Sequence, residues 1–325
     1  MSEKIKIGII GIGHVANYQL EAIKKTTLFD LIALCDNDES KCKNNIFDKP
    51  FYTDYKEMLN NHNFDAIVIS VPNISHFEIT DYLIGKIDNI LLEKPATLTM
   101  KHFDLLAKKS LECSTNLVIA YHAKFALDLL WFVDNYENKL QKELGDIIAF
   151  RCDFFDPYID DKSVLSKNAE KLNGSWIDSG INALSVVSRI IDSSDLFLES
   201  FFSTNIPSFN CSDIQCNANF LYRLNNKLYH GQINTNWSLS LNRKTTHLFF
   251  ENGNYIILHH SLQQVLRFNY KNERSVIADF SNEGERLVNH YSGVFNDFYE
   301  RIKNNNNNIE LSRKLHSLLL NKKPR

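Results

Sequence analysis

The sequence contains no long apolar run, which bears on where the protein works. No window of the 325 residues approaches the roughly 20 consecutive apolar residues of a membrane-spanning helix. The short apolar run near the start contains Gly8, Gly11 and Gly13, and no small-residue cleavage site follows it, unlike in a secretory signal peptide. We therefore expect a cytoplasmic protein without a membrane segment.

Cysteine pairs and an excess of one charge are also missing. The six cysteines include no C-x-x-C pair, so we expect reduced thiols rather than disulfides or zinc ligands. The other acids and histidines show no ligand spacing, and we predict no metal. A formal net charge of only -3 gives no general attraction to phosphate backbones or anionic lipids. We expect neither nucleic acid nor a membrane as a partner.

The first 120 or so residues alternate short apolar runs with amphipathic stretches. The runs are rich in Ile, Val and Leu and lack polar alternation, as in strands buried on both faces. They are Lys6–Ile10, Leu31–Cys35, Ala66–Val71, Ile90–Leu92 and Leu117–Ala120. This alternation predicts an α/β domain with a doubly wound parallel sheet and right-handed crossovers.

The pattern changes after Tyr121. Between about residues 196 and 280, turn dipeptides separate β-prone runs, which predicts a mainly antiparallel sheet. The tail is helical again, and its asparagine run, Asn304–Asn308, is interpreted as a surface loop. We predict a first domain over residues 1–121 and an α+β domain over residues 122–325, whose last helices can pack back on the first domain.

The first predicted strand leads into a glycine-rich turn. Gly11-Ile12-Gly13-His14-Val15-Ala16 matches G-x-G-x-x-A between a strand and a helix, the context that a dinucleotide needs. Gly11 permits the tight turn, Gly13 lets a pyrophosphate approach the backbone, and Ala16 lets the helix pack closely. The free N–H groups at the helix start, around His14 and Val15, then bind the phosphates.

Asp36 ends the second predicted strand, roughly 20 residues past the glycine turn. An acidic residue there accepts hydrogen bonds from the ribose hydroxyls and repels a 2′-phosphate. No arginine follows it, since the next residues are Asn37, Asp38 and Glu39. The sequence therefore predicts NAD rather than NADP. The alternative is that Asp36 only caps the next turn.

A lysine follows another predicted strand, in Glu93-Lys94-Pro95. Ligands of parallel sheets bind outside the carboxyl ends of the strands, so Lys94 is placed to meet a substrate beside the nicotinamide. Pro95 allows a cis bond that fixes the direction of the lysine. A surface lysine in a turn is the alternative, because a match of three residues decides little.

Together these motifs resemble those of the Gfo/Idh/MocA oxidoreductases. The resemblance rests on the glycine turn, Val71-Pro72-Asn73 with His76, Glu93-Lys94-Pro95, Tyr121-His122-Ala123-Lys124-Phe125 and Gly174-Ser175-Trp176-Ile177-Asp178-Ser179-Gly180-Ile181-Asn182, and it spans nearly the whole chain. It implies a Rossmann domain, an open sheet domain, a nicotinamide cofactor, and a sugar, cyclitol or nucleotide-sugar substrate. It also implies a homodimer or homotetramer formed through the sheet of the second domain.

The resemblance makes Lys94 the catalytic lysine and Asp178 the catalytic aspartate. The D-x-G-x-H motif of the family usually ends in an acid/base histidine, but Asn182 stands there and cannot titrate. The pattern D-S-G-x-N resembles the branch of the L-arabinose and D-galactose 1-dehydrogenases, in which the asparagine is part of the site. Oxidation at C1 of such an aldose gives an aldonolactone.

Hydride loss from C1 needs a base within reach of the anomeric hydroxyl. We expect Asp178 to be this base and Lys94 to orient the oxygens and stabilise negative charge. The reverse assignment stays open, because burial lowers the pKa of a lysine. Asn182 is expected to hold the substrate hydroxyls.

Further residues are expected around the ligands. His122 and Asp153 are expected to contact the sugar, and Trp176 either contacts it or belongs to the core. The residues expected beside the cofactor are Pro72, Asn73, His76, Glu93 and Lys94. His76 has the alternative of being only a helix-start residue.

Two other functions remain open. A sugar phosphate or nucleotide-sugar would need basic residues facing the pocket, and the candidates are Lys124, Arg151, Lys162, Lys171 and Arg243. The missing histidine also allows a catalytically silent sensor of NAD and sugar. Retention of Lys94 and Asp178 argues against the sensor.

Overall fold

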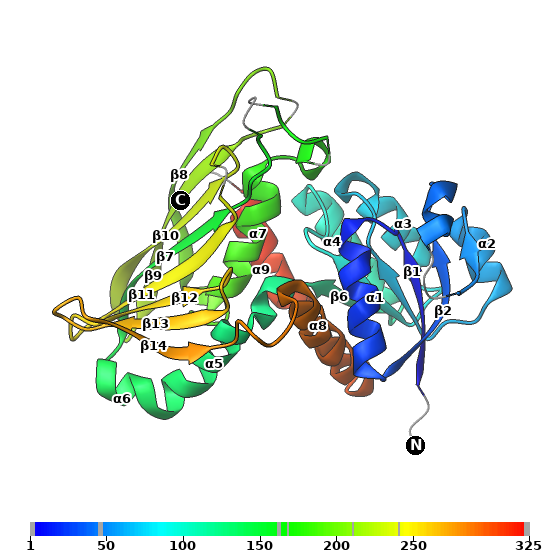
Figure 1. The fold of residues 1–325 in the computed structure, drawn as a ribbon. Helices are drawn as coiled ribbons and strands as arrows, with labels where there is room; N and C mark the ends of the chain where they lie inside the picture. The colour runs from blue at the N-terminus through cyan, green and yellow to red at the C-terminus, as the bar shows by residue number, and fades with distance from the viewer. Residues whose placement is uncertain are drawn as a thin grey trace. The chain divides into compact units, whose positions relative to one another are not determined.

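A computed structural model describes residues 4–44, 48–160, 164–167, 169–209, 211–239 and 241–321. Lys162 lies outside the described residues. The chain forms two compact units (Figure 1). Unit 1 comprises Met1–Tyr121 and Tyr291–Arg313, and unit 2 comprises His122–His290 and Lys314–Arg325.

Unit 1 is built on a six-stranded parallel sheet in the order β3-β2-β1-β4-β5-β6. The strands are β1 (Ile5–Ile10), β2 (Phe29–Cys35), β3 (Phe51–Tyr52), β4 (Ala66–Ile69), β5 (Asn89–Glu93) and β6 (Asn116–Ala120). All four residues of β4 are fully buried, because helices cover both faces of such a sheet. The predicted doubly wound parallel sheet is confirmed.

Helices connect these strands, as the alternating pattern indicates. They are α1 (His14–Thr26), η1 (Glu39–Asn44), α2 (Tyr55–Asn61), η2 (Asn73–Ser75), α3 (His76–Leu83) and α4 (Met100–Glu112). Side chains fix two of their starts. Asp54 accepts a hydrogen bond from Lys56 N at the start of α2, and Thr99 accepts one from His102 N at the start of α4.

Two long helices near the end of the chain are divided between the units. The helix α8 (Arg286–Lys303) begins in unit 2 and ends in unit 1, and α9 (Ile309–Leu320) begins in unit 1 and ends in unit 2. Within unit 1, Phe295 and Phe298 of α8 pack against Phe29 of β2.

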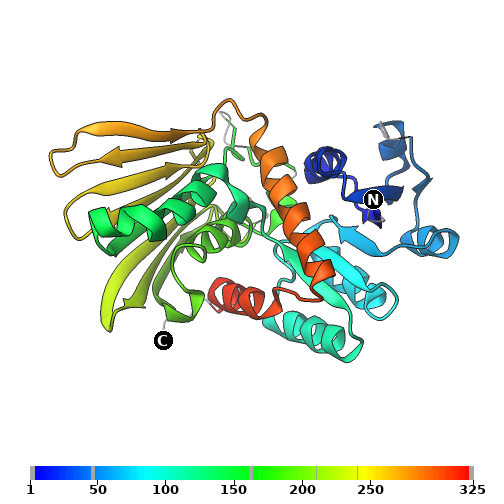
Figure 2. The ribbon, with the colours of Figure 1, turned by 90° about the horizontal axis from the view of Figure 1, so that it is seen from below.

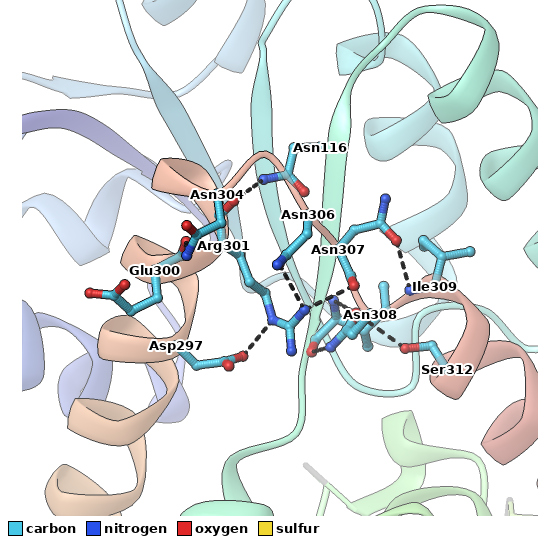
Figure 3. Close-up of polar contacts among 11 residues, drawn as sticks. Asn116, Asp297, Glu300, Arg301, Asn304, Asn306, Asn307, Asn308, Ile309 and Ser312 are labelled. Atoms are coloured by element: carbon cyan, nitrogen blue, oxygen red, sulfur yellow. Dashed lines mark hydrogen bonds and ion pairs between the residues drawn. The ribbon is translucent and has the colours of Figure 1, made fainter.

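The asparagine run that joins these helices is only partly a surface loop. Residues 304–307 are exposed, but Asn308 is 8% exposed and contacts β6, at the edge of the sheet (Figure 3). Its Nδ2 donates to Ile119 O at 2.8 Å, and its Oδ1 accepts from Ile119 N at 2.9 Å. The side-chain amide therefore pairs with β6 as a neighbouring strand would.

We expect Asn308→Ala to lower the free energy of unfolding by about 2 kcal/mol, because it leaves both backbone groups of Ile119 without partners. Urea unfolding of the full chain measures this loss. Asn304→Ala is the matched control, since Asn304 is exposed and its side chain donates to Glu300 O, a local acceptor four residues earlier in the chain. Equal effects of the two substitutions would contradict the strand-pairing role.

Unit 2 contains an eight-stranded sheet in the order β14-β13-β12-β11-β7-β10-β9-β8. The strands are β7 (Ile147–Phe155), β8 (Leu196–Thr204), β9 (Gln215–Leu224), β10 (Lys227–Asn236), β11 (Arg243–Phe250), β12 (Tyr255–His259), β13 (Gln264–Phe268) and β14 (Arg274–Asp279). Within the described residues, β7 and β10 pair in parallel and the other neighbouring strands of this sheet pair antiparallel. The predicted mainly antiparallel sheet is confirmed.

Helices pack against one face of this sheet (Figure 2). Those of unit 2 are η3 (His122–Phe125), α5 (Leu127–Asn135), η4 (Tyr136–Leu140), α6 (Gln141–Leu144), η5 (Ala169–Leu172), η6 (Trp176–Gly180), α7 (Ile181–Val187) and η7 (Ser193–Asp195). The opposite face carries polar side chains together with the exposed Phe202 and Leu228. Pairing of subunits through this face stays a prediction.

Candidate active site

The strand order of the unit 1 sheet reverses beside β1. From β1 the sheet continues to β2 and β3 on one side and to β4, β5 and β6 on the other. Ligands of such sheets bind outside the carboxyl ends of the strands at this reversal. The glycine turn follows β1 and Lys94 follows β5, so both stand at the carboxyl edge of one sheet.

Gly11 and Gly13 serve different needs in the turn. Gly11 has a φ of +97°, and a Cβ there would collide with the backbone of Ser70. Around Gly13, by contrast, the position of a Cβ is open space. Gly13 precedes α1, whose start at His14 and Val15 carries no side-chain cap among the described residues. A pyrophosphate therefore fits the open position and the positive end of the helix.

Asp36 helps to hold this turn. Its Oδ2 accepts a hydrogen bond from Ile12 N at 2.7 Å, and its Oδ1 accepts one from Asp38 N at 2.9 Å. The turn-capping role that the sequence left open is thus present. A carboxylate offers about four acceptor positions, so Asp36 retains capacity for ribose hydroxyls.

The loop after β4 carries Pro72 and Asn73. Pro72 is exposed, whereas Asn73 is 8% exposed and its Nδ2 has no hydrogen-bond partner in the part of the chain that the structure describes. Buried donors without a partner are uncommon in folded proteins. The orphaned Nδ2 fits a nearby ligand that supplies an acceptor.

His76 is buried at the start of α3, with both ring nitrogens against backbone carbonyls. Nδ1 lies 2.8 Å from Pro95 O, and Nε2 lies 2.9 Å from Val71 O. Burial lowers the pKa of His76, and a neutral ring carries one N–H, so it donates to one carbonyl at a time at neutral pH. His76 thus links the loops after β4 and β5, which favours a positioning role over direct cofactor contact.

Glu93 is another buried link within unit 1. Its Oε1 accepts from Gln19 Nε2 at 2.8 Å and from the Tyr291 hydroxyl at 2.7 Å, and its Oε2 accepts from Lys94 N at 3.1 Å. Burial raises the pKa of Glu93, and these donors oppose the rise. Because its oxygens are occupied, the geometry favours a role in holding α1, α8 and the end of β5 together.

Lys94 itself is half-buried, directly after β5. The Lys94–Pro95 peptide is cis. Glu93 fixes the backbone of Lys94 from one side, and His76 contacts the carbonyl of Pro95 from the other. The backbone that carries the lysine is therefore held at two points.

Asp178 lies in unit 2, in the π-helical turn η6 that continues directly into α7. It is 7% exposed. Asn182 follows four residues later, on the same helical face, and its Nδ2 donates to Asp178 O at 3.2 Å. Asn182 Oδ1 is buried and has no partner within the described ranges. The carboxylate and the orphaned amide oxygen suit a ligand that offers hydroxyl groups.

Trp176 begins the same turn but faces the core. Asp213 anchors the turn, since its Oδ1 accepts from Ser175 Oγ at 2.8 Å and from Trp176 N at 2.9 Å. The Trp176 side chain is fully buried, and its Nε1 donates to Leu319 O at 2.9 Å. This favours the core role that the sequence left open over substrate contact.

His122 lies in η3, which packs against α7. Its Nδ1 is 3.4 Å from Nδ1 of the buried His290, and the two rings stack. Burial, and secondarily the charge of His122, holds the pKa of His290 well below its usual value. His290 is therefore neutral at neutral pH. No sequence motif marks His290, so it was absent from the predicted site.

Asp153 and Asp178 lie on opposite sides of the unit 2 sheet, so the geometry does not favour the sugar contact predicted for Asp153. Side chains alternate between the faces of a sheet. Lys244 and Thr235 share the face covered by η6, because they contact Asp156 and Ser175 there. Phe154 occupies the register position between them, so its neighbour Asp153 points to the other face. There it accepts from Arg151 Nε at 2.9 Å and from Asn234 Nδ2 at 2.7 Å.

Two of the basic residues that were candidates for binding a substrate phosphate lie on the same face of the unit 2 sheet as Asp153. Arg151 pairs with Asp153 on β7, and Arg243, two residues before Thr245 on β11, lies over the ring of Phe155. Neither is on the side of the sheet that carries Asp178. Lys124 and Lys171 lie outside the sheet, in η3 and η5.

No cluster of three or more His, Cys, Asp or Glu side chains suited to a metal ion occurs in the ranges that the structure covers. Within the same ranges, no helix has the length and apolar character needed to cross a membrane.

Comparison with known proteins gives a family match and relatives that cover parts of the chain. Residues 5–117 match the Gfo/Idh/MocA family, described as an oxidoreductase family with an NAD-binding Rossmann fold. The uncharacterised oxidoreductase YdgJ of Escherichia coli (strain K12) is 30% identical over 112 residues, 33% of this chain and 32% of that protein. Glucose-6-phosphate 3-dehydrogenase of Bacillus subtilis (strain 168) is 22% identical over 218 residues, 62% of this chain and 59% of that protein.

The matched segments thus span less than two thirds of either curated relative. A solved structure of myo-inositol 2-dehydrogenase from Lactobacillus plantarum is similar in fold, with a TM-score of 0.77 at 18% identity, covering 98% of this chain and 96% of that one. At this identity the similarity concerns the fold alone. The family match agrees with the motifs, and residues 5–117 are similar to the NAD-binding Rossmann fold of the Gfo/Idh/MocA oxidoreductase family.

Proposed function

We propose that the protein is an NAD-dependent dehydrogenase that oxidises a hydroxyl-bearing carbon of a sugar or cyclitol. The observation that carries this proposal is the placement of the open glycine turn and Lys94 at the same carboxyl edge of the unit 1 sheet. Support also comes from the relatives, one named as a dehydrogenase of a sugar phosphate and one as a dehydrogenase of a cyclitol.

Residues of unit 1 would hold the cofactor. The open position at Gly13 and the start of α1 would take the pyrophosphate, and Asp36 would accept hydrogen bonds from the ribose hydroxyls. When bound, NAD would supply the acceptor for the hydride that leaves the substrate carbon. The carboxylate of Asp36 disfavours the 2′-phosphate of NADP.

Asp178 and Lys94 act on the substrate. Asp178 removes the proton from the hydroxyl whose carbon loses the hydride, so the oxygen becomes a carbonyl. Lys94 donates hydrogen bonds to that oxygen and stabilises the negative charge that develops on it. Asn182 accepts a hydrogen bond from a neighbouring hydroxyl through its orphaned Oδ1 and so orients the ring.

The specific substrate that we propose is a free aldose of the arabinose or galactose type, oxidised at C1 to the aldonolactone. The support is the Asp178–Asn182 pair, in which an amide replaces the titratable histidine. A neutral amide and one carboxylate suit a neutral sugar.

A phosphorylated sugar is the second candidate. Glucose-6-phosphate 3-dehydrogenase matches this chain over 218 residues, and that named substrate carries a phosphate. Lys124 and Lys171 are the lysines of unit 2 that remain candidates for binding it, since Arg151 and Arg243 lie on the other face of the sheet.

A substrate panel tests these proposals. The full chain is mixed with NAD and, separately, L-arabinose, D-galactose, myo-inositol, glucose 6-phosphate or a nucleotide-sugar, and the absorbance of reduced cofactor is followed. We expect the fastest reduction with a free aldose. Fastest reduction with glucose 6-phosphate would favour the second candidate, whereas sugar binding without any reduction would favour a sensor.

The cofactor preference gives a separate prediction. We expect Asp36→Ala to weaken the binding of NAD roughly 10- to 100-fold, because hydrogen bonds to a charged acceptor contribute about 1.5–3 kcal/mol. It should also narrow the preference for NAD over NADP. Isothermal titration with both cofactors measures the change, and Asp65→Ala is a control at an exposed aspartate of unit 1. An unmodified protein that already prefers NADP would contradict the role of Asp36.

A further inference from the structure

The helical segment that carries Asp178 and Asn182 has no cap of its own. It begins with η6 at Trp176 and continues into α7. The first N–H groups of a helix have no acceptors within the helix. Ser175 precedes the segment, but its side chain makes no capping hydrogen bond within the described residues. The N–H group of Trp176 therefore needs an acceptor from elsewhere.

Asp213, in the loop before β9, supplies this acceptor. Its Oδ1 accepts from Trp176 N at 2.9 Å and from Ser175 Oγ at 2.8 Å, and its backbone oxygen accepts from Ser175 N at 3.1 Å. Asp213 is fully buried, and a carboxylate at the start of a helix interacts favourably with the helix dipole. A residue 38 positions from Ser175 in the sequence thus caps the helical segment.

Gly174 lets Asp213 come this close. Its φ is +102°, and a Cβ there would lie 2.4 Å from Ser212 Oγ and 3.0 Å from Asp213 N. The Ser212 hydroxyl is itself 2.6 Å from Asn173 O and 2.8 Å from Asp213 Oδ2. The loop that carries Asp213 is therefore fixed against the start of the helical segment.

The cap lies close in the chain to the proposed base. Asp178 N donates to Gly174 O at 3.1 Å, so Asp178 belongs to the first turn after the cap. Asn182 follows one turn later, and its Nδ2 donates to Asp178 O at 3.2 Å. The ring of Trp176 packs on Gly180, where a Cβ would lie 2.7 Å from it. The positions of both site residues thus depend on where the segment begins.

We infer that Asp213 is a positioning residue for the proposed reaction, which caps the helical segment and so fixes Asp178 and Asn182 within unit 2. The inference rests on the proposed roles of these two residues. None of the sequence motifs contains Asp213. The stabilisation that a charge gives at a helix end falls off within one turn, so we expect Asp178 to depend on the cap more than Asn182.

Hydrogen exchange of the full chain, without any ligand, measures this role. We expect Asp213→Ala to speed the exchange of the backbone amides of residues 177–180 by roughly 5- to 30-fold, the usual effect of a lost cap on a local equilibrium. Residues 184–187, at the end of α7, should exchange at nearly the unmodified rate. A general structural role would instead speed exchange in both stretches alike.

Asp213→Asn is the conservative variant. An asparagine caps a helix about as well as an aspartate, and its amide oxygen can replace Oδ1 as the acceptor for Trp176 N and Ser175 Oγ. We therefore expect it to keep most of the protection from exchange. Asp192→Ala is the matched control, because Asp192 caps η7 by accepting from Ser194 N at 2.8 Å, and η7 carries no predicted site residue.

Should Asp213→Ala fail to fold, Ser175→Ala tests the same cap. It removes the hydroxyl that lies 2.8 Å from both Asp213 Oδ1 and Thr235 Oγ1. It should speed the exchange of residues 177–180 by roughly 2- to 10-fold, the usual contribution of one hydrogen bond. Acceleration confined to these residues would support the inference. Unchanged exchange there, or equal acceleration throughout unit 2, would overturn it.

Turnover gives an independent measurement. With the sugar that reacts fastest in the panel, we expect Asp213→Ala to lower kcat by roughly 10- to 100-fold, because a misplacement of about 1 Å can reduce a rate by a factor of this order. The affinity for NAD should stay unchanged, and Asp213→Asn should recover most of the lost rate. Unchanged kcat in Asp213→Ala would also overturn the inference. The proposed function fails by a different result, namely unchanged sugar oxidation in Asp178→Asn, which leaves the exchange test intact.

Discussion

We expect Lys94→Ala to lower kcat by about 100- to 1,000-fold and to leave the binding of NAD intact. The reason is that removing one preorganised donor to a developing oxyanion costs roughly this factor. The substitution leaves the glycine turn and Asp36 intact. Turnover of the sugar that reacts fastest in the panel gives kcat, and titration with NAD gives the affinity for the cofactor.

Lys86→Ala is the control for this experiment, since Lys86 is an exposed lysine of the same unit. We expect it to leave kcat within experimental scatter. Unchanged turnover in Lys94→Ala would remove the lysine from the mechanism. Loss of NAD binding along with turnover would instead place Lys94 at the cofactor.

Asp178→Asn is expected to lower kcat by about 100- to 10,000-fold, the usual contribution of a general base. The amide preserves the shape of the side chain but takes up no proton at neutral pH, so the acidic limb of the rate profile should also disappear. Thermal unfolding checks that the buried turn is intact. Asp134→Asn, at an exposed aspartate of α5, is the control.

This variant also separates the two assignments of the base. If Lys94 were the base, Asp178→Asn would retain most of its turnover and keep an ionisation in its rate profile. Lys94→Ala would then abolish that ionisation. With Asp178 as the base, we expect the reverse pattern.

The fold was predictable because its signals are local. Strands buried on both faces, such as β4 (Ala66–Ile69), form continuous apolar runs that cannot be mistaken for amphipathic helices. Asn225-Asn226 is one of the turn dipeptides of the predicted antiparallel sheet; it joins β9 and β10, and both residues have positive φ, as a type I′ turn requires. Such patterns are complete within about ten residues of sequence.

The surroundings of the site residues were less predictable, because they depend on distant partners. Glu93 is held by the Tyr291 hydroxyl, 198 residues away. His76 was expected near the cofactor, but which atoms face its ring nitrogens depends on how two loops fold together. No periodicity in the sequence contains this information.

Asp153 shows a second limit. Alternation of side chains along β7 places Asp153 and Phe154 on opposite faces of the sheet. The sequence did not reveal which face the helices cover. For the same reason the sequence did not predict the ion pair of Lys244 and Asp156. A lysine in a strand normally points to solvent, whereas Lys244 is buried and paired with Asp156.

Transfer of deuterium tests the central proposal most directly. D-galactose labelled with deuterium at C1 is incubated with the protein and NAD, and the reduced cofactor is analysed by mass spectrometry. We expect the reduced cofactor to carry the deuterium, because the hydride leaves C1. Reduced cofactor without the label, or no reduced cofactor at all with this sugar, would contradict oxidation at that carbon.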